Sequence, residues 1–235
     1  MAAFSAARQN STERLNVPAG KAFELSTGLS AELVVPAQPA ALLVLAHGAG
    51  AGFQHATMLA ISEAFAATGI ATLRFNFPFM QAGKRRVDAR DVAMDAICCA
   101  VERAGIECPD LPLLLGGHSF GGRMASHAVI ERDLAPVKAL IFCAFPLHPA
   151  GKPGTTRADH LVEINLPMLF LSGSRDALAE PGLLEQTVAD LGQKAELHRL
   201  ATADHSYKIL KRQRSDDVFA EMAAIARDLV KRLID

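Results

Sequence analysis

Short apolar runs alternate with stretches of helical spacing along most of this chain, and this alternation constrains its fold more than any other feature. Residues 41–46, for example, read ALLVLA and are apolar throughout. A strand with one face in solvent alternates apolar and polar residues, so a continuous run predicts a strand buried on both faces, as in a parallel sheet. In the stretch after it, Val92, Ala96 and Ala100 recur with the period of a helix that covers a sheet. We therefore expect an α/β fold, a mostly parallel sheet with helices on both faces.

The expected elements extend from residue 22 to near the last residue. Strands are expected at 22–26, 30–35, 41–46, 70–75, 111–115, 137–142, 168–171 and 196–200, and helices at 56–68, 88–104, 121–131, 183–191 and 216–234. Thr27-Gly28 between the first two strands is typical of a hairpin turn. The loop 146–165 lacks periodicity and is too short for a cap domain. Because no linker divides the chain, we expect a flexible arm at 1–20 and a single domain at 21–235.

Composition excludes several classes of function. The 24 Lys and Arg residues balance 25 Asp and Glu residues, which leaves no basic excess for holding a nucleic acid. No leader and no apolar run of membrane length is found, so we expect a cytoplasmic protein without membrane insertion. The four cysteines show neither a CxxC pair nor a zinc-ligand spacing, which predicts reduced thiols and no metal. The sequence indicates no oligomeric state.

The most specific motif is the G-x-S-x-G stretch Gly117-His118-Ser119-Phe120-Gly121. It lies between an expected strand and an expected helix, the context in which such a serine is a nucleophile on a sharp turn. Glycines two residues before and after the serine allow neighbouring backbones to approach. The context therefore favours Ser119 as a catalytic nucleophile over an idle serine in a glycine-rich turn.

A nucleophilic serine needs a base and an acid that orients the base, and both are expected downstream of it. His205 follows the last expected strand, and Asp176 follows the strand at 168–171. Both thus fall at the carboxyl edge of the sheet, where Ser119 also lies. The other downstream residues considered for these roles are His148, His160, His198 and Asp204.

A glycine-rich turn, His47-Gly48-Ala49-Gly50, follows the strand at 41–46. We expect the amides of Ala49 and Phe120 to form an oxyanion hole, and His47 to brace the turn rather than act as a base. A dinucleotide-binding loop is the alternative for these glycines. It is disfavoured because Phe53 stands where the third glycine is required and no acidic residue ends the strand at 70–75.

Together these segments resemble the α/β-hydrolase superfamily over about residues 20–235. The resemblance rests on Ala46-His47-Gly48-Ala49-Gly50, Arg74-Phe75-Asn76-Phe77-Pro78, the stretch from Gly117 to Ser126, Pro146-Leu147-His148-Pro149 and Asp204-His205-Ser206. It is greatest to the compact branch related to dienelactone hydrolases and to testis-expressed and chromatin-complex hydrolase-like proteins. The resemblance implies an eight-stranded sheet and a Ser/Asp/His triad. Dienelactone hydrolases carry a cysteine nucleophile where this chain has Ser119, so their substrate is not carried over.

These features predict a serine hydrolase without cofactor or metal that cleaves an ester or thioester of a small acyl substrate. Phe53, Phe77, Met80 and His148 are expected to line its pocket, although ordinary packing also explains the apolar ones. The basic run at 84–86 is either an attraction for an anionic substrate or a solvated surface. The alternative function is a hydrolase-fold interaction module with little or no catalysis.

Overall fold

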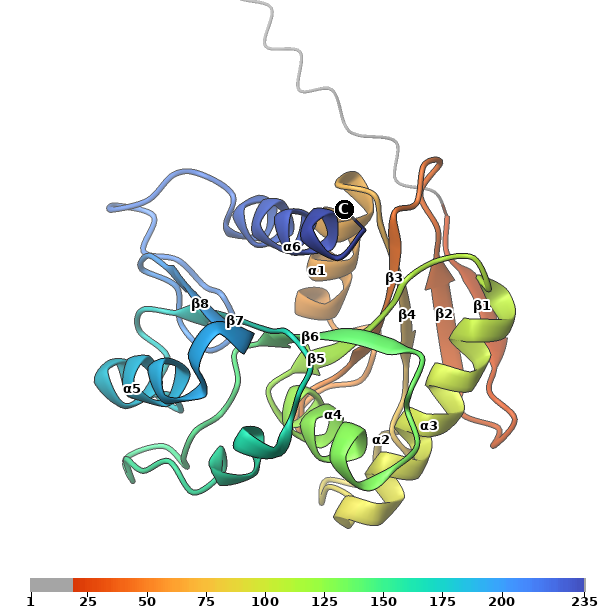
Figure 1. Ribbon diagram of the computed structural model, residues 1–235, viewed down its shortest axis with the longest axis horizontal. Coiled ribbons are helices and arrows are strands. Elements are labelled where there is room, and N and C mark those ends of the chain that lie inside the picture. The colour runs from red at the N-terminus through yellow and green to blue at the C-terminus, as the bar shows by residue number, and fades with distance from the viewer. Residues whose placement is uncertain (1–18, 235) are drawn as a thin grey trace, which may run out of the picture.

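Eight strands form one sheet in the computed structural model, which describes residues 19–234 (Figure 1). The strands are β1 (Lys21–Glu24), β2 (Ser30–Val34), β3 (Ala41–Ala46), β4 (Ile70–Phe75), β5 (Leu113–His118), β6 (Val137–Cys143), β7 (Met168–Gly173) and β8 (Ala195–Leu200). Their order is β1-β2-β4-β3-β5-β6-β7-β8. The pairs β1–β2 and β2–β4 are antiparallel and the others are parallel. The predicted mostly parallel sheet is confirmed; the arm predicted at 1–20 lies almost wholly outside the described residues.

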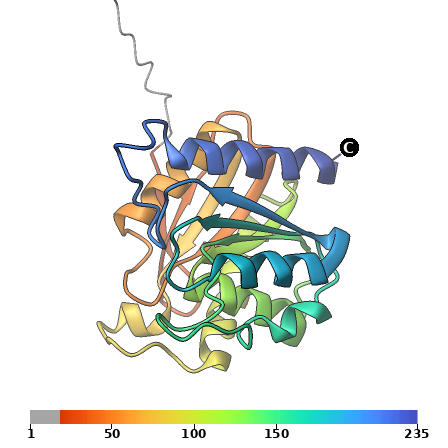
Figure 2. The ribbon, with the colours of Figure 1, turned by 90° about the vertical axis from the view of Figure 1, so that its left-hand side faces the viewer.

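Helices cover both faces of this sheet, as predicted (Figure 2). They are α1 (Ala56–Ala67), α2 (Pro78–Gln81), α3 (Arg90–Glu107), α4 (Phe120–Glu131), α5 (Pro181–Leu191) and α6 (Val218–Ile234), with short 3-10 helices at Asp159–Glu163 and Gly192–Lys194. Figure 1 shows α1 and α6 on one face and α3, α4 and α5 on the other. In β3, Leu42 and Val44 join the core under α3 and α4, whereas Leu43 and Leu45 join the core under α1 and α6. The apolar run at 41–46 is therefore continuous because each face of the strand is buried.

Strand β5 differs from its prediction, because it begins at Leu113 and continues to His118 instead of ending at Leu115. Gly116 and Gly117 belong to the strand rather than to the turn. A Cβ atom at Gly116 would overlap the carbonyl oxygen of Ile141 on the neighbouring strand. Glycine at this position thus permits close approach of two strands, and the chain turns only at Ser119.

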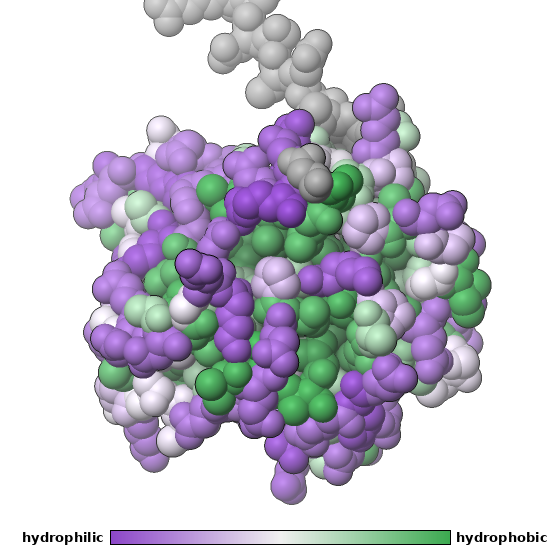
Figure 3. All heavy atoms as spheres, in the orientation of Figure 1, coloured by the Kyte–Doolittle hydropathy of each residue, from purple (hydrophilic) through white to green (hydrophobic). Residues whose placement is uncertain are grey.

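The one helical segment in the long loop at 146–165 is the 3-10 helix Asp159–Glu163, so no cap domain covers the sheet in the part of the chain that the structure describes. The short helix α2 was not predicted. Figure 3 shows hydrophilic side chains around the rim of one face and hydrophobic residues in its centre. In the described part of the chain, no helix has both the length and the apolar character needed to cross a membrane.

Candidate active site

Ser119 lies at the junction of β5 and α4 in a strained backbone conformation. Its φ is +52° and its ψ is −114°, a region that residues other than glycine rarely adopt. The amide of Ser119 donates a hydrogen bond to the carbonyl oxygen of Cys143 at 2.9 Å, which holds the turn. A Cβ at Gly117 or at Gly121 would overlap the carbonyl oxygen of Ala46. The glycines of the motif therefore allow this sharp turn to lie against β3.

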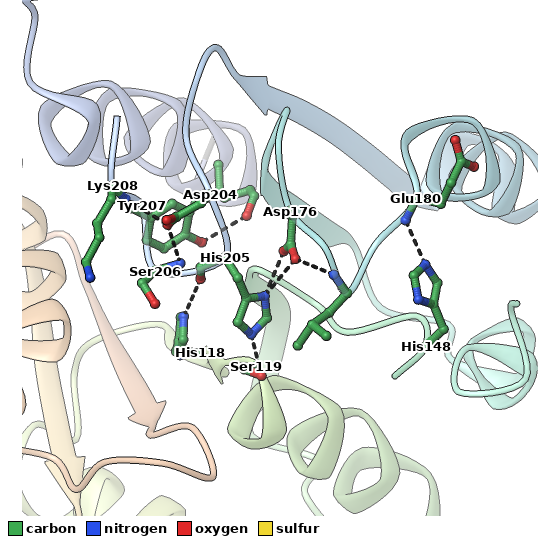
Figure 4. Close-up of polar contacts among 12 residues, drawn as sticks. His118, Ser119, His148, Asp176, Glu180, Asp204, His205, Ser206, Tyr207 and Lys208 are labelled. Atoms are coloured by element: carbon green, nitrogen blue, oxygen red, sulfur yellow. Dashed lines mark hydrogen bonds and ion pairs between the residues drawn. The ribbon is translucent and has the colours of Figure 1, made fainter. Parts of the chain in front are cut away.

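The structure brings Ser119, His205 and Asp176 into one hydrogen-bonded chain (Figure 4). Nε2 of His205 lies 2.8 Å from Oγ of Ser119. Nδ1 of His205 lies 2.9 Å from Oδ1 and 2.8 Å from Oδ2 of Asp176. Asp176 is buried, and its Oδ1 also accepts a hydrogen bond from the amide of Leu178 at 2.8 Å. With Nδ1 donating to the carboxylate, Nε2 is left free to accept the proton of the serine hydroxyl.

Contacts between the loops that follow β7 and β8 place the acid and the histidine together. The amide of Arg175 donates to the carbonyl oxygen of Ala203 at 2.9 Å, so the two loops run side by side. A Cβ at Gly173 would overlap the same carbonyl. The hydroxyl of the buried Tyr207 donates to the carbonyl oxygen of Leu171 on β7 at 2.9 Å. These contacts fix the loop that carries His205 over the end of the sheet.

The other residues considered as base or acid have partners of their own. These contacts join His148 to the Glu180 amide at 2.9 Å, His160 to the Ser126 hydroxyl at 2.7 Å, His198 to the Glu221 carboxylate at 2.6 Å, and Asp204 to the Ser206 amide at 2.9 Å. Figure 4 shows His148 apart from Ser119, with its ring directed at the amide of Glu180. None of these four side chains contacts Ser119 or His205 through a hydrogen bond within residues 19–234.

The amides of Ala49 and Phe120, expected to hold an oxyanion, form no hydrogen bond with any described residue. Phe120 is the first residue of α4, so its N–H has no carbonyl partner inside the helix. Ala49 and Phe120 also line one cleft together with Ser119. Two free donors beside the serine hydroxyl form the arrangement that can stabilise an anionic tetrahedral intermediate.

His47 braces the turn that carries Ala49, as expected from the sequence. Its Nε2 accepts a hydrogen bond from the amide of Phe77 at 3.0 Å, and its Nδ1 donates to the carbonyl oxygen of Gly48 at 2.7 Å. Burial lowers the pKa of His47 to about 4, so the ring is neutral at pH 7. A neutral ring matches this pattern, because one nitrogen accepts while the other donates.

His118, the variable residue before the serine in the G-x-S-x-G motif, contacts the triad, a role that was not predicted from the sequence. Its Nε2 donates to the main-chain carbonyl oxygen of His205 at 2.9 Å, and the centroids of the two rings are 5.2 Å apart. Burial lowers the pKa of His118 to about 4, which keeps the ring neutral. His118 therefore supports the backbone of the loop that presents His205. In the sequence, the one sign of this role is the position of His118 next to the proposed nucleophile.

Two clefts meet at Ser119, and Ala49 and Leu178 line both of them. The first has a volume of about 370 Å³ and is also lined by Gly48, Gly50, Ala51, His55, Thr57, Met58, His118, His205 and Ser206. The second has a volume of about 360 Å³ and is also lined by Val87, Asp88, Arg90, Phe120, Arg123, Met124, Pro146 and Arg157. Leu178 carries no sequence signal, since only tertiary structure brings its loop to the serine.

The residues predicted to line the pocket lie elsewhere. Phe53, Phe77 and His148 are buried, and Met80 packs against the core under α3 and α4. Phe77 stacks edge-on against the rings of His47 and Phe120, with centroids 4.9 Å and 5.4 Å away. None of the four borders either cleft. Phe77 thus packs against the turn residues His47 and Phe120, whereas Phe120 itself lines the second cleft.

No cluster suited to a metal ion is found in the part of the chain that the structure describes. Within it, no three His, Cys, Asp or Glu side chains come together as a metal site requires. Cys98, Cys99, Cys108 and Cys143 are all free thiols. Burial raises the pKa of Cys143 to about 12, so this thiol is inert at neutral pH.

Comparisons with known proteins agree with this fold. A family model described as an alpha/beta hydrolase domain matches residues 39–233. A dienelactone hydrolase from Anabaena variabilis has a similar structure, with a TM-score of 0.70 and 19% identity over 90% of this chain and 96% of that one. Est1E from Butyrivibrio proteoclasticus has a TM-score of 0.65 and 15% identity, covering 92% of this chain and 98% of its own.

A third similar structure is XC6422 from Xanthomonas campestris, described as an α/β serine hydrolase without a lid. Its TM-score is 0.62 at 18% identity, over 92% of this chain and 93% of that one. At such identities the solved structures show a shared fold. The family match extends over the sheet from β3 to β8 and over the elements that carry Ser119, Asp176 and His205. The chain belongs to the α/β-hydrolase family.

Proposed function

We propose that this protein is a serine hydrolase that cleaves an ester or thioester of a small acyl substrate through an acyl-enzyme. The observation that carries the proposal is the hydrogen-bonded chain from Asp176 through His205 to Ser119. It supplies the nucleophile, base and orienting carboxylate that acyl transfer requires. The strained backbone of Ser119 and the free amides beside it support the same chemistry.

In the first half of the proposed reaction, Oγ of Ser119 attacks the carbonyl carbon of the substrate. Nε2 of His205 takes the hydroxyl proton, and Asp176 stabilises the resulting imidazolium. The amides of Ala49 and Phe120 donate to the oxyanion of the tetrahedral intermediate. The bond to the leaving group then breaks, and His205 returns the proton to the departing oxygen or sulfur.

In the second half, water replaces the leaving group and attacks the acyl-enzyme. His205 accepts a proton from the water, and the bond between the acyl carbon and Oγ breaks. The proton then returns to Ser119, and a carboxylic acid is released. No further reactant is consumed, because the ester and one water yield one acid and one alcohol.

Steady-state kinetics on a series of 4-nitrophenyl esters of increasing acyl length tests this proposal. We expect Ser119→Ala to lower kcat on the order of 10³-fold or more while circular dichroism remains that of the native fold. The matched control is Ser215→Ala, the same substitution at an exposed serine. A folded Ser119→Ala protein with wild-type turnover contradicts the proposal. Absence of any turnover by the wild type with every ester tested favours the alternative function, a hydrolase-fold interaction module with little or no catalysis.

A further inference from the structure

The second cleft at Ser119 is lined by three arginines. Arg90 lies at the start of α3, Arg123 on α4 and Arg157 in the loop between β6 and β7. Asp88 is the only carboxylate among the lining residues, and its Oδ2 already accepts a hydrogen bond from the amide of Phe79 at 2.9 Å. The cleft therefore carries net positive charge directly beside the proposed nucleophile.

Arg123 is tied closely to the nucleophile, since it lies one helical turn after Ser119. Its main-chain amide donates to the carbonyl oxygen of Ser119 at 3.1 Å. Its Nε is buried and has no hydrogen-bond partner among the described residues. Burial, and then repulsion by Arg157 and Arg90, lowers the pKa of Arg123. A buried donor surrounded by like charges is costly unless an anion compensates it.

Two of the three guanidinium groups have no carboxylate partner among the described residues. Arg90 forms an exposed ion pair with Glu131, at 3.4 Å. By contrast, Arg123 and Arg157 form no ion pair within residues 19–234. Elsewhere in the described residues, Arg132 does pair with Asp95 at 3.2 Å, whereas exposed arginines such as Arg85 and Arg227 form no ion pair. Arg123 and Arg157 differ from these two exposed residues because both are half-buried and line the cleft beside Ser119.

The position of His205 indicates which part of a substrate would occupy this cleft. His205 lines the first cleft and not the second. Because the proposed mechanism returns a proton from Nε2 of His205 to the leaving group, the leaving group belongs on the side of the first cleft. The acyl group is then left for the second cleft, against Phe120 and the arginines.

We propose that the second cleft selects acyl groups that end in a carboxylate, so that the preferred substrates are monoesters or monothioesters of dicarboxylic acids. Arg123 and Arg157 are the specificity-determining residues, because a guanidinium can bind a carboxylate through two parallel hydrogen bonds. This inference rests on the proposed hydrolase function. The cleft is also lined by the apolar residues Val87, Met124 and Leu178, which suit the methylene chain between the two carbonyl groups of a dicarboxylic acid.

The test compares two esters of equal chain length, 4-nitrophenyl monoadipate and 4-nitrophenyl hexanoate. A six-carbon diacid is chosen because shorter ones place the free carboxylate where it attacks the ester intramolecularly. We expect the wild type to favour the monoadipate in kcat/KM, and Arg123→Met and Arg157→Ala each to reduce that preference about 10- to 100-fold, the worth of a charged hydrogen bond. Arg132→Ala is the matched control and should keep the preference, since Arg132 lies outside the cleft.

The outcomes separate this inference from the proposed function. Hydrolysis of both esters without preference in the wild type overturns the carboxylate selection and leaves the hydrolase intact. Failure to hydrolyse either ester, together with failure of Ser119 to react with a fluorophosphonate, overturns both. Free adipate should inhibit hexanoate hydrolysis more strongly than inorganic phosphate does, and the reverse order also overturns the inference. If Arg123→Met does not fold, the ester preference of Arg157→Ala decides between these outcomes, because Arg157 lies in a loop and its replacement leaves the helices and strands unchanged.

Discussion

The buried ring of His47 should make the stability of this protein depend on pH between about 6.5 and 4. The ring is completely buried, donates to Gly48 and accepts from Phe77, and burial lowers its pKa from 6.5 to about 4. In the unfolded chain the ring keeps the higher value. Between the two pKa values the unfolded state therefore binds a proton that the folded state does not.

The sign of the effect follows from this difference. Above pH 6.5 the ring is neutral in both states and His47 imposes no cost. As the pH falls from 6.5 towards 4, protonation stabilises the unfolded state, so stability is lost by about 1.4 kcal/mol per pH unit. With the pKa near 4 in the folded protein, the loss at pH 5 is about 2 kcal/mol and approaches about 3 kcal/mol below pH 4.

Urea denaturation of the wild type and of His47→Gln, measured from pH 7.5 to pH 4.5, checks this value. Glutamine can still accept the hydrogen bond from Phe77 but does not titrate. At pH 7.5, the difference in unfolding free energy between the two proteins measures the packing and hydrogen bonding lost in the variant. The change in that difference with pH measures the contribution of His47 protonation alone. Between pH 7.5 and pH 5, we expect the unfolding free energy of the variant to fall by about 2 kcal/mol less than that of the wild type. Parallel curves for the two proteins would refute the account of His47 as a neutral buried brace.

Two further predictions concern the triad and the turn. Asp176→Asn should lower kcat on the order of 10⁴-fold with the fold retained, because the amide cannot hold the tautomer of His205 that leaves Nε2 free. Ester turnover measures kcat and circular dichroism measures the fold. A near-wild-type kcat would contradict the role of Asp176 in orienting His205. Gly121→Ala should destabilise the protein by about 1–3 kcal/mol, since its Cβ would lie 2.7 Å from the carbonyl oxygen of His47. Gly105→Ala, at an exposed position of α3 with open space around it, should instead stabilise by about 0.5–1 kcal/mol, and equal unfolding free energies for the two variants would contradict the packing argument.

The strands were predictable because their signal is local. The run at 41–46 is apolar at every position since β3 is buried on both faces, and the same reasoning identifies the apolar first part of β7. Strand β5 was predicted three residues short at its carboxyl end, because paired glycines are typical of turns. Here they serve close packing against neighbouring strands. Helix α2, with four residues, is too short for periodicity to reveal.

The positions of Ser119, Asp176 and His205 along the chain were sufficient to predict that they lie at one edge of the sheet. Each follows a parallel strand, and the carboxyl ends of parallel strands meet at the same edge. The walls of the clefts could not be predicted in this way. Whether an apolar residue such as Phe77 faces the core or a ligand depends on the packing of distant segments. Likewise Arg123 and Arg157 meet only because the loop after β6 folds back over α4.

The central claim, that Ser119 is an activated nucleophile, is tested most directly by intact-mass spectrometry after reaction with a fluorophosphonate. Such a probe forms a covalent bond with a serine whose proton is removed by a neighbouring base. We predict one adduct per wild-type chain, located on Ser119 by peptide mapping, and no adduct on Ser119→Ala or on the unfolded wild type. The absence of an adduct on folded wild-type protein, or an adduct on another residue that persists in Ser119→Ala, would contradict the claim.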